Sequence, residues 1–514
     1  MTTKRFVLLI AGVIACASCG DSQTSSARVI ESTLDGGRFR TVYTFRPAGD
    51  ITNVALLFSG DGGWSDGMSD MARRLAGEGF LVGGVDTTTY IESIQPRAAT
   101  DKCTYAAGDM EALSQHLQWK FDMPAYLRPV LIGYSAGSSL VYTSLAQSNR
   151  GTFAGGVGLS FCAEMDLDRA KLCKGTGFQF DDLPTHTQIE LKPSAQFPYP
   201  WTVVHGDEDD ECSALQTRRF VSGIPAARLI SLPRAGHDLE PLSDWWPRLR
   251  KDYRAMVAGD TAAPRHVAAA GDAAADALAE LPIIEVPATA PGSDLFAVMI
   301  SGDGGWAALD QGVTKELAAH GIPTAGLNSL KYFWHARDAD TTAQDVNRMI
   351  THYAAVWNKH RVLLIGYSFG ADVMPSVFNR LPAETRVRAA SVSLLGLGPA
   401  ATYEVTVGEW LPGADAKGDP VVPEVQRMPK VPLLCIQGKD ETDTQCPALA
   451  KLGAEVRTFG EGHHFGGLYS EIAAAILQHG AAAPSAPASP SARSADPPPI
   501  SPSAIAADRP VDRL

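Results

Sequence analysis

The stretch Arg361-Val-Leu-Leu-Ile-Gly-Tyr-Ser-Phe-Gly370 decides the fold of this protein. Its long apolar run predicts a strand that is buried on both faces of a parallel sheet. Its end has the pattern Gly-x-Ser-x-Gly, which is typical of a sharp turn between a strand and a helix that exposes a serine hydroxyl. We therefore expect a nucleophilic serine at position 368, at the carboxyl end of a central strand.

The chain repeats this pattern. Leu131-Ile-Gly-Tyr-Ser135 recurs as Leu364-Ile-Gly-Tyr-Ser368, and Ser59-Gly-Asp-Gly-Gly-Trp64 recurs as Ser301-Gly-Asp-Gly-Gly-Trp306. Two motifs repeated in the same order predict two homologous domains, which we place at residues 28–257 and 282–480. An Ala-, Gly- and Asp-rich linker is expected at 258–281. The Ala-, Pro- and Ser-rich tail at 481–514 has few large apolar residues and is expected to be disordered.

Apolar runs alternate with amphipathic stretches in both domains. The expected strands are Val54–Ser59, Phe80–Asp86 and Pro129–Tyr134 in the first domain, and Leu295–Ser301, Ile322–Leu327 and Arg361–Tyr367 in the second. Helical patterns lie between them, as at Asp109–Lys120 and Thr341–Trp357. This alternation predicts the α/β class, with two tandem α/β-hydrolase-like domains, each a mainly parallel sheet flanked by helices.

The N-terminus reads as a secretory signal over residues 1–20. Lys4 and Arg5 precede the apolar run Phe6–Ile14, and small residues follow it. We expect a periplasmic protein, either soluble after cleavage or anchored to the membrane by a lipid on Cys16, with Cys19 as the second candidate. The chain carries a formal net charge of −13 and has no cluster of Lys and Arg, which argues against binding nucleic acid.

Cysteines of an exported protein are expected to form disulfides. Cys435 and Cys446 are the only pair in the C-terminal domain and are the first expected bridge. Cys162 with Cys173 is the second, which leaves Cys103 with Cys212. The cysteine spacing does not resemble a zinc site, and we expect neither a metal nor a cofactor.

A nucleophilic serine needs a base, and the base needs a carboxylate that orients it. In α/β-hydrolases the order along the chain is serine, acid, histidine. An acidic loop follows the expected strand Val431–Gln437, and we take Asp443 as the acid, with Asp440 as the alternative. After the last expected strand, Gly462-His463 supplies the base, with His464 as the alternative.

The N-terminal domain carries the same order of residues. The pattern Asp-x-x-Cys aligns Asp209 with Asp443, and Gly-His aligns His237 with His463. Ser135, Asp209 and His237 are therefore a candidate second triad, with Asp207 as the alternative acid. We favour the C-terminal triad for catalysis, because the first copy has a serine at the position that Asp372 holds in the second.

The glycine-rich loop at 301–306 follows a strand and can direct backbone N–H groups at an oxyanion. We expect Gly304 to supply one of these groups and Phe369, the residue after the nucleophile, to supply the other. Asp303 in this loop and Asp372, one helical turn after Ser368, are candidates for binding a cationic substrate, although Asp372 can equally brace its helix.

These residues resemble the VirJ/AcvB family of bacterial virulence proteins. The resemblance rests on Gly366-Tyr-Ser-Phe-Gly-Ala-Asp-Val-Met-Pro375, on Ser301–Trp306 and on Gly462-His-His-Phe465, and the layout is similar to the two-domain AcvB type. It implies a periplasmic hydrolase that removes the aminoacyl group from lysyl-phosphatidylglycerol, with Ser368, Asp443 and His463 as its triad. It also implies an aminoacylated phospholipid as substrate, contact with the membrane and a link to secretion-system proteins. The alternatives are a generic esterase, lipase or peptidase of the same fold, and a non-catalytic periplasmic adaptor for type IV secretion.

Overall fold

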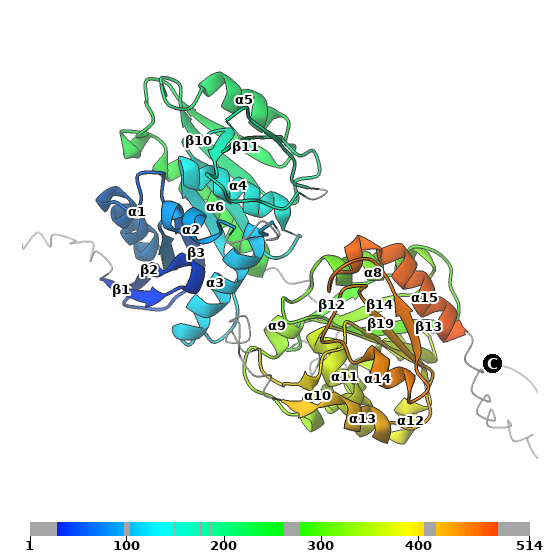
Figure 1. Ribbon diagram of the computed structural model, residues 1–514. Coiled ribbons are helices and arrows are strands. Elements are labelled where there is room, and N and C mark those ends of the chain that lie inside the picture. The colour runs from blue at the N-terminus through cyan, green and yellow to red at the C-terminus, as the bar shows by residue number, and fades with distance from the viewer. Residues whose placement is uncertain are drawn as a thin grey trace, which may run out of the picture.

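The computed structural model describes residues 28–96, 103–148, 150–174, 177–185, 187–261, 278, 280–405 and 418–481. The expected signal at 1–20, most of the expected linker and the tail beyond residue 481 lie outside these residues. The described chain forms two sheet-bearing halves, coloured blue to green and green to red in Figure 1. Each half is an α/β unit, as the alternation of apolar and amphipathic stretches predicts.

The N-terminal half is built on an eight-stranded sheet in the order β1-β2-β4-β3-β5-β6-β10-β11. The strands β1 and β2 pair antiparallel to their neighbours, and the others run parallel. The elements are β1 (Val29–Asp35), η1 (Gly37–Phe39), β2 (Thr41–Pro47), β3 (Asn53–Phe58), α1 (Asp66–Gly77), β4 (Phe80–Val85), α2 (Thr87–Ser93), α3 (Ala106–Lys120), β5 (Val130–Tyr134), α4 (Ala136–Gln147), β6 (Gly155–Leu159), β7 (Glu164–Asp166), β8 (Phe180–Asp182), β9 (Gln188–Leu191), β10 (Trp201–Gly206), α5 (Ala214–Ser222), β11 (Ala227–Leu232), η2 (Leu242–Asp244) and α6 (Trp246–Thr261).

The C-terminal half repeats this plan on a seven-stranded sheet in the order β12-β14-β13-β15-β16-β19-β20. Only the edge strand β12 pairs antiparallel within it. The elements are β12 (Ile283–Val286), β13 (Leu295–Ile300), α8 (Ala308–Ala319), β14 (Thr324–Leu327), α9 (Ser329–Tyr332), α10 (Ala339–Val356), β15 (Arg361–Tyr367), α11 (Phe369–Arg380), α12 (Ala383–Arg386), β16 (Ala389–Leu395), β17 (Ala400–Ala401), β18 (Asp419–Pro420), α13 (Val421–Arg427), β19 (Leu433–Gln437), α14 (Cys446–Ala450), β20 (Glu455–Thr458), η4 (Phe465–Gly467) and α15 (Tyr469–Ala481).

Helices cover both faces of each sheet. In the N-terminal half, α3 and α4 pack on one face, and α1 and α6 pack on the other. In the C-terminal half, α10 and α11 pack on the face that corresponds to that of α3 and α4, and α8 and α15 pack on the opposite face. Strands covered on both sides must be apolar throughout, which explains the continuous apolar runs of β3, β13 and β15.

The two halves touch through the segment that follows α3. The indole Nε1–H of Trp334 donates a hydrogen bond to the Met123 carbonyl at 2.8 Å, and the Tyr126 ring lies 5.4 Å from the Trp334 ring between centroids. Tyr126 is buried among apolar side chains of the C-terminal half. A second contact joins the Gln311 amide to the Arg150 carbonyl at 2.6 Å. These contacts bring α3 toward the C-terminal half, beside α9 in Figure 1.

One of the three expected disulfides is confirmed. Cys435 and Cys446 are bridged, but the other bridges are Cys103–Cys173 and Cys162–Cys212. The predicted pairs Cys162–Cys173 and Cys103–Cys212 are therefore wrong. Cys162 follows β6 and Cys212 follows β10, and these two strands are neighbours in the sheet. Their carboxyl ends meet in space, so closeness in the sequence was a poor guide to the pairing.

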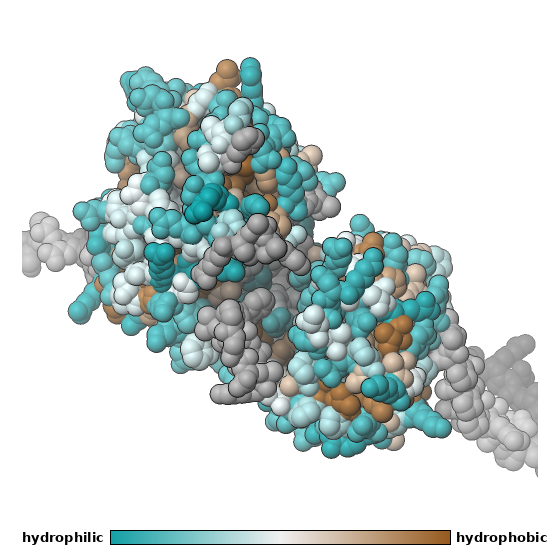
Figure 2. Space-filling model, in the orientation of Figure 1, coloured by the Kyte–Doolittle hydropathy of each residue, from teal (hydrophilic) through white to brown (hydrophobic). Residues whose placement is uncertain are grey.

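The surface seen in Figure 2 is mostly hydrophilic, with apolar side chains in scattered groups on both halves. Among the described residues, none of the helices combines the length and the apolar character needed to cross a bilayer.

Candidate active site

Ser368 occupies a strained turn between β15 and α11. Its backbone has φ 52° and ψ −119°, a left-handed conformation that a residue with a side chain rarely adopts. A Cβ on Gly366 would lie 2.3 Å from the Gly370 carbonyl oxygen, and one on Gly370 would lie 2.1 Å from that of Ile300. Both glycines are therefore required by close packing. The turn places a partly exposed serine at the carboxyl end of a central strand.

His463 lies beside this turn. The Ser368 N–H donates to the Leu395 carbonyl at 2.8 Å, and a Cβ on the next residue, Gly396, would lie 2.6 Å from Cε1 of His463. The imidazole also lies 5.5 Å from the Tyr367 ring between centroids. The histidine that follows the last strand is thus brought to the serine turn, as the order of residues predicts.

The partner of His463 is Glu441. The Nδ1 atom of His463 forms a short hydrogen bond with the Glu441 carboxylate, whose side chain is only 7% exposed. The other oxygen of this carboxylate accepts the Gly438 N–H at 2.8 Å. Held at Nδ1, the imidazole is left with Nε2 as the nitrogen that can accept a proton.

Glu441 changes the acidity of His463. Burial disfavours the imidazolium and lowers the pKa of His463, but the hydrogen bond and charge of Glu441 outweigh it, with smaller contributions from Asp303 and Asp443. The pKa of His463 is therefore raised above its ordinary value, which makes this imidazole a stronger base.

The expectation that Asp443 orients His463 is corrected by this geometry. The carboxylate bonded to the imidazole belongs to Glu441, and Asp443 acts on His463 only through its charge. The alternative, Asp440, accepts the N–H of Gly462 and so holds the loop that carries the histidine.

The acids of the two loops correspond when residues are counted from the glycine at the end of the preceding strand, and not from the cysteine that follows. Glu441 is the third residue after Gly438, as Asp209 is the third after Gly206. Both glycines mark the end of the preceding strand, which fixes the start of the loop in space. The C-terminal loop carries its extra residues after the acid, so aligning the loops by the following cysteine selected the wrong carboxylate.

The alternative base, His464, has another partner. Its Nδ1 lies 2.7 Å from the Tyr367 hydroxyl. Burial, followed by the charge of His463, lowers the pKa of His464, and burial raises the pKa of Tyr367 well above its usual value. The neutral Tyr367 hydroxyl therefore donates a hydrogen bond to the neutral imidazole of His464. This bond holds both side chains in place beside Ser368.

The expected oxyanion donor Gly304 is engaged elsewhere. Its N–H donates to the Asp303 carboxylate at 3.0 Å, because the short aspartate side chain folds back onto its own loop. The loop residue that lies against the nucleophile is Gly302, where a Cβ would be 3.5 Å from Cβ of Ser368. Phe369 is the first residue of α11, so its N–H belongs to the amides that have no partner within the helix.

Asp372 braces the fold. Its carboxylate accepts the N–H of Gly398 at 2.7 Å, which ties α11 to the loop after β16. That loop includes Gly396, which packs against His463. Of the two roles considered for Asp372, the structure supports bracing over binding a cation.

Asp303 meets an acidic residue from the other half of the chain. A Cβ on Gly304 would lie 3.6 Å from Oε1 of Glu111, which belongs to α3. Burial, followed by the charge of Asp303, raises the pKa of Glu111 to about 8. Burial also raises the pKa of Asp303, against the lowering effects of the Gly304 N–H and the charge of His463. Sequence reasoning missed Glu111, since nothing in the helical pattern of α3 marks it.

The N-terminal half has an equivalent arrangement. Ser135 has φ 52° and ψ −121°, and Nδ1 of His237 lies 3.0 Å from the Asp209 carboxylate. Asp209, Cys212 and His237 also lie close enough together to resemble a metal site. The sulfur of Cys212 is bonded to Cys162, however, so it offers no thiolate to a metal.

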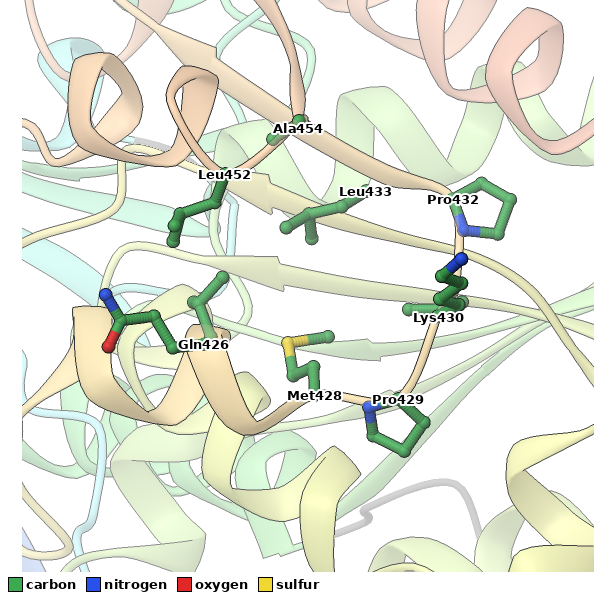
Figure 3. A pocket seen from close by; sticks show the side chains of 11 residues that line it. Gln426, Met428, Pro429, Lys430, Pro432, Leu433, Leu452 and Ala454 are labelled. Atoms are coloured by element: carbon green, nitrogen blue, oxygen red, sulfur yellow. The ribbon is translucent and has the colours of Figure 1, made fainter.

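A surface hollow of about 450 Å³ lies elsewhere on the C-terminal half. Figure 3 shows its wall, which comes from the end of α13, the segment that leads to β19, the first residue of β19 and the turn before β20. This is the amino end of the parallel strands, whereas Ser368 lies at the carboxyl end. Ligands of parallel α/β sheets bind at the carboxyl end, so the hollow is not part of the candidate active site.

Several solved structures resemble parts of the chain. A putative dienelactone hydrolase from Klebsiella pneumoniae is 14% identical, with a TM-score of 0.31 over 46% of this chain and 99% of its own. A cold-adapted esterase from an Arctic intertidal metagenomic library is 13% identical, with a TM-score of 0.30 over 45% and 94%. An α/β serine hydrolase without a lid from Xanthomonas campestris is 16% identical, with a TM-score of 0.29 over 45% and 95%. At these scores the likenesses carry no argument about activity.

No curated protein matches the chain significantly. The family described as bacterial virulence protein (VirJ) matches residues 52–160 and 294–483, which together make up more than half of the sequence. The first region contains Ser135, and the second contains Ser368 with the acidic loop and His463. The chain therefore belongs to the VirJ family of bacterial virulence proteins.

Proposed function

We propose that this protein is a serine hydrolase that cleaves the aminoacyl ester of lysyl-phosphatidylglycerol through an acyl-enzyme on Ser368. The observation that carries the proposal is the strained serine turn beside His463, whose Nδ1 is held by the buried Glu441. A serine that is exposed by its backbone, next to an oriented imidazole, is the arrangement that nucleophilic catalysis of acyl transfer requires.

The reaction follows from this geometry. The Nε2 atom of His463 takes the proton of the Ser368 hydroxyl as the oxygen attacks the ester carbonyl. The Phe369 N–H and the backbone around Gly302 receive the oxyanion. The intermediate collapses and the C–O bond to phosphatidylglycerol breaks, and the leaving glycerol oxygen takes the proton from His463 to become a hydroxyl. Water then attacks the lysyl ester of Ser368, with His463 again as the base, and free lysine leaves.

The charge around the site suits a cationic acyl group. The lysyl group carries two ammonium groups, and the carboxyl groups of Asp303 and Glu111 lie together at the glycine-rich loop. An ammonium between them favours their ionised forms, which burial otherwise opposes. This match favours the lysyl ester over a neutral acyl ester, which is the substrate of the rival generic esterase.

We place this activity in the periplasm, on the grounds of the expected signal at residues 1–20. The substrate lies in a membrane, so the protein must meet the bilayer surface, either peripherally or through a lipid on Cys16. A non-catalytic adaptor for secretion is the other rival, and it requires no reactive serine.

The test uses the purified full chain with vesicles that contain lysyl-phosphatidylglycerol, and it measures released lysine. Ser368→Ala should lower the rate at least about a hundredfold, because the nucleophile is lost. Ser470→Ala, an exposed serine at the start of α15, is the matched control and should keep the rate. Lysine release by the Ser368→Ala variant at the rate of the unmutated protein would contradict the proposal.

The rivals give different results in the same preparation. A generic esterase hydrolyses neutral acyl esters faster than lysyl-phosphatidylglycerol. An adaptor fails to react with a serine-directed fluorophosphonate at either serine turn.

A further inference from the structure

We infer that the N-terminal half contains a second active site, in which Ser135, His237 and Asp209 hydrolyse small esters of α-amino acids. This inference goes beyond the proposed function, which assigns catalysis to Ser368. The inference concerns a different serine on a different sheet, so an experiment can contradict it and leave the proposed function of Ser368 intact.

The serine turn of this half is as strained as that of Ser368. Ser135 has φ 52°, and a Cβ on Gly133 would lie 2.1 Å from the Gly137 carbonyl oxygen. The glycine-rich loop is also in place, since a Cβ on Gly60 would lie 3.3 Å from Cβ of Ser135. A turn without a catalytic role does not require a serine with positive φ, because glycine adopts this backbone conformation at a lower cost in free energy. The preserved strain argues for a working nucleophile.

The base is oriented and its outer nitrogen is available. Nδ1 of His237 lies 3.1 and 3.0 Å from the two oxygens of Asp209, whose side chain is fully buried. The side chain of His237 is 9% exposed, and its Nε2 forms no hydrogen bond among the described residues, although the carboxylate of Glu211 lies 3.4 Å away. A buried imidazole nitrogen without a hydrogen bond is costly, and a bound substrate or the serine hydroxyl would supply one.

The acid is fixed from several sides. The Asp209 carboxylate accepts the N–H groups of Glu211 and Cys212 at 3.0 and 2.8 Å. Cys212 is tied by its disulfide to Cys162, which follows the adjacent strand. The Ser160 hydroxyl donates to the His237 carbonyl at 2.6 Å and so holds the base from the same strand end. Each member of the triad is held in position by the surrounding fold.

Glu211 indicates the class of substrate. Its carboxylate lies 3.4 Å from Nε2 of His237, and its side chain is 66% exposed. The serine oxygen attacks a carbonyl carbon next to this nitrogen, and in an ester of an α-amino acid the ammonium is only two bonds from that carbon. The carboxylate of Glu211 is therefore within reach of an ion pair with such an ammonium. Asp443 has the corresponding position in the sequence of the other half, two residues after Glu441.

The exposure of the site limits the size of the substrate. Ser135 is 7% exposed, and the side chain of His237 is 9% exposed, against 41% for His463. Ser135 and its base are therefore less accessible than His463, which favours small aminoacyl esters over a substrate embedded in a bilayer.

Labelling with a fluorophosphonate tests the site directly. Ser368→Ala removes the other nucleophile, and the purified full-length variant should still be labelled. Adding Ser135→Ala should abolish the label, and mass spectrometry should place it on Ser135. An unlabelled Ser368→Ala protein with unchanged thermal unfolding would overturn the inference, and it would leave the proposal for Ser368 untouched.

The substrate class is tested in the same Ser368→Ala background. Ethyl alaninate and ethyl isobutyrate have acyl groups of similar shape and differ in the ammonium group. We expect kcat/KM for the alanine ester to exceed that for isobutyrate at least tenfold. Glu211→Gln should reduce this ratio about threefold to fivefold, the size expected for an ion pair that is largely exposed. Glu208→Gln, an exposed residue of the same loop, should leave it unchanged. Equal hydrolysis of both esters would overturn the assignment to α-amino acids.

Discussion

At the scale of single residues, the orienting carboxylate is what distinguishes the two sites. The N-terminal half uses Asp209, and the C-terminal half uses Glu441, which is one methylene longer. Both occupy the third position after the glycine that ends a strand. Because the strand end fixes this position, the residue type can change while the contact with the histidine is kept.

Replacing Glu441 provides the sharpest test at this scale. Glu441→Gln removes the negative charge that raises the pKa of His463 and leaves Nδ1 with a neutral partner. We expect kcat to fall about ten-thousandfold, as in a serine-protease triad that loses the charge of its acid. Glu461→Gln, an exposed neighbour of the same histidine loop, should keep kcat. Asp443→Asn should keep kcat within about tenfold, and a loss as deep as that of Glu441→Gln would return the orienting role to Asp443.

The pH profile of the same variants follows from the sign of the shift. His463 works as a base only when it is neutral, and its pKa is raised, so activity falls as the pH drops through that raised value. In Glu441→Gln the residual activity should extend to lower pH, because the favourable charge is gone while burial still opposes the imidazolium.

At the scale of elements, the site depends on how closely α11 approaches β13. The first turn of this helix rests on the end of β13, where a Cβ on Gly370 would lie 2.1 Å from the Ile300 carbonyl oxygen. Backbone atoms cannot move aside as a flexible side chain can. The strand, the turn and the helix must therefore shift together if this glycine is replaced.

Gly370→Ala should lower the free energy of unfolding by about 2 kcal/mol or more, within the usual range for overpacking in a core. Gly108→Ala is the matched control, since Gly108 also lies in the first turn of a helix but a Cβ added there would meet no other atom within 4 Å. Urea denaturation measures both variants. Equal free energies of unfolding for the two variants would contradict this prediction, because α11 could then move away from β13 without loss of stability.

At the scale of the whole molecule, the N-terminal half takes part in the C-terminal site. Glu111 comes from α3, and it reaches the glycine-rich loop because the segment after α3 docks on the C-terminal half through Tyr126 and Trp334. The pKa of Glu111 is raised to about 8, first by burial and then by the charge of Asp303. Below that pH its carboxyl group is largely neutral in the free protein.

A cationic substrate should therefore bind better as the pH rises through about 8, because the ionised Glu111 then meets the ammonium without the cost of losing a proton. KM for lysyl-phosphatidylglycerol should fall over this range in the unmutated protein. Glu111→Gln should raise KM several-fold at pH 9 and flatten its dependence on pH, with little change in kcat. Glu92→Gln, an exposed residue of α2, should retain the original profile. A fall in kcat alone would contradict a role in binding.

The sequence alone determined the features that depend on neighbours along the chain. The repeated motifs, the alternation of strands and helices, the two serine turns and the bridge between Cys435 and Cys446 all follow from local patterns, because steric limits and hydrophobic periodicity act over a few residues. Only the tertiary structure decided which groups meet across loops, namely Glu441 with His463, and Glu111 with the site of the other half. Such contacts depend on where strand ends and domain surfaces lie in space, and spacing in the sequence does not record this.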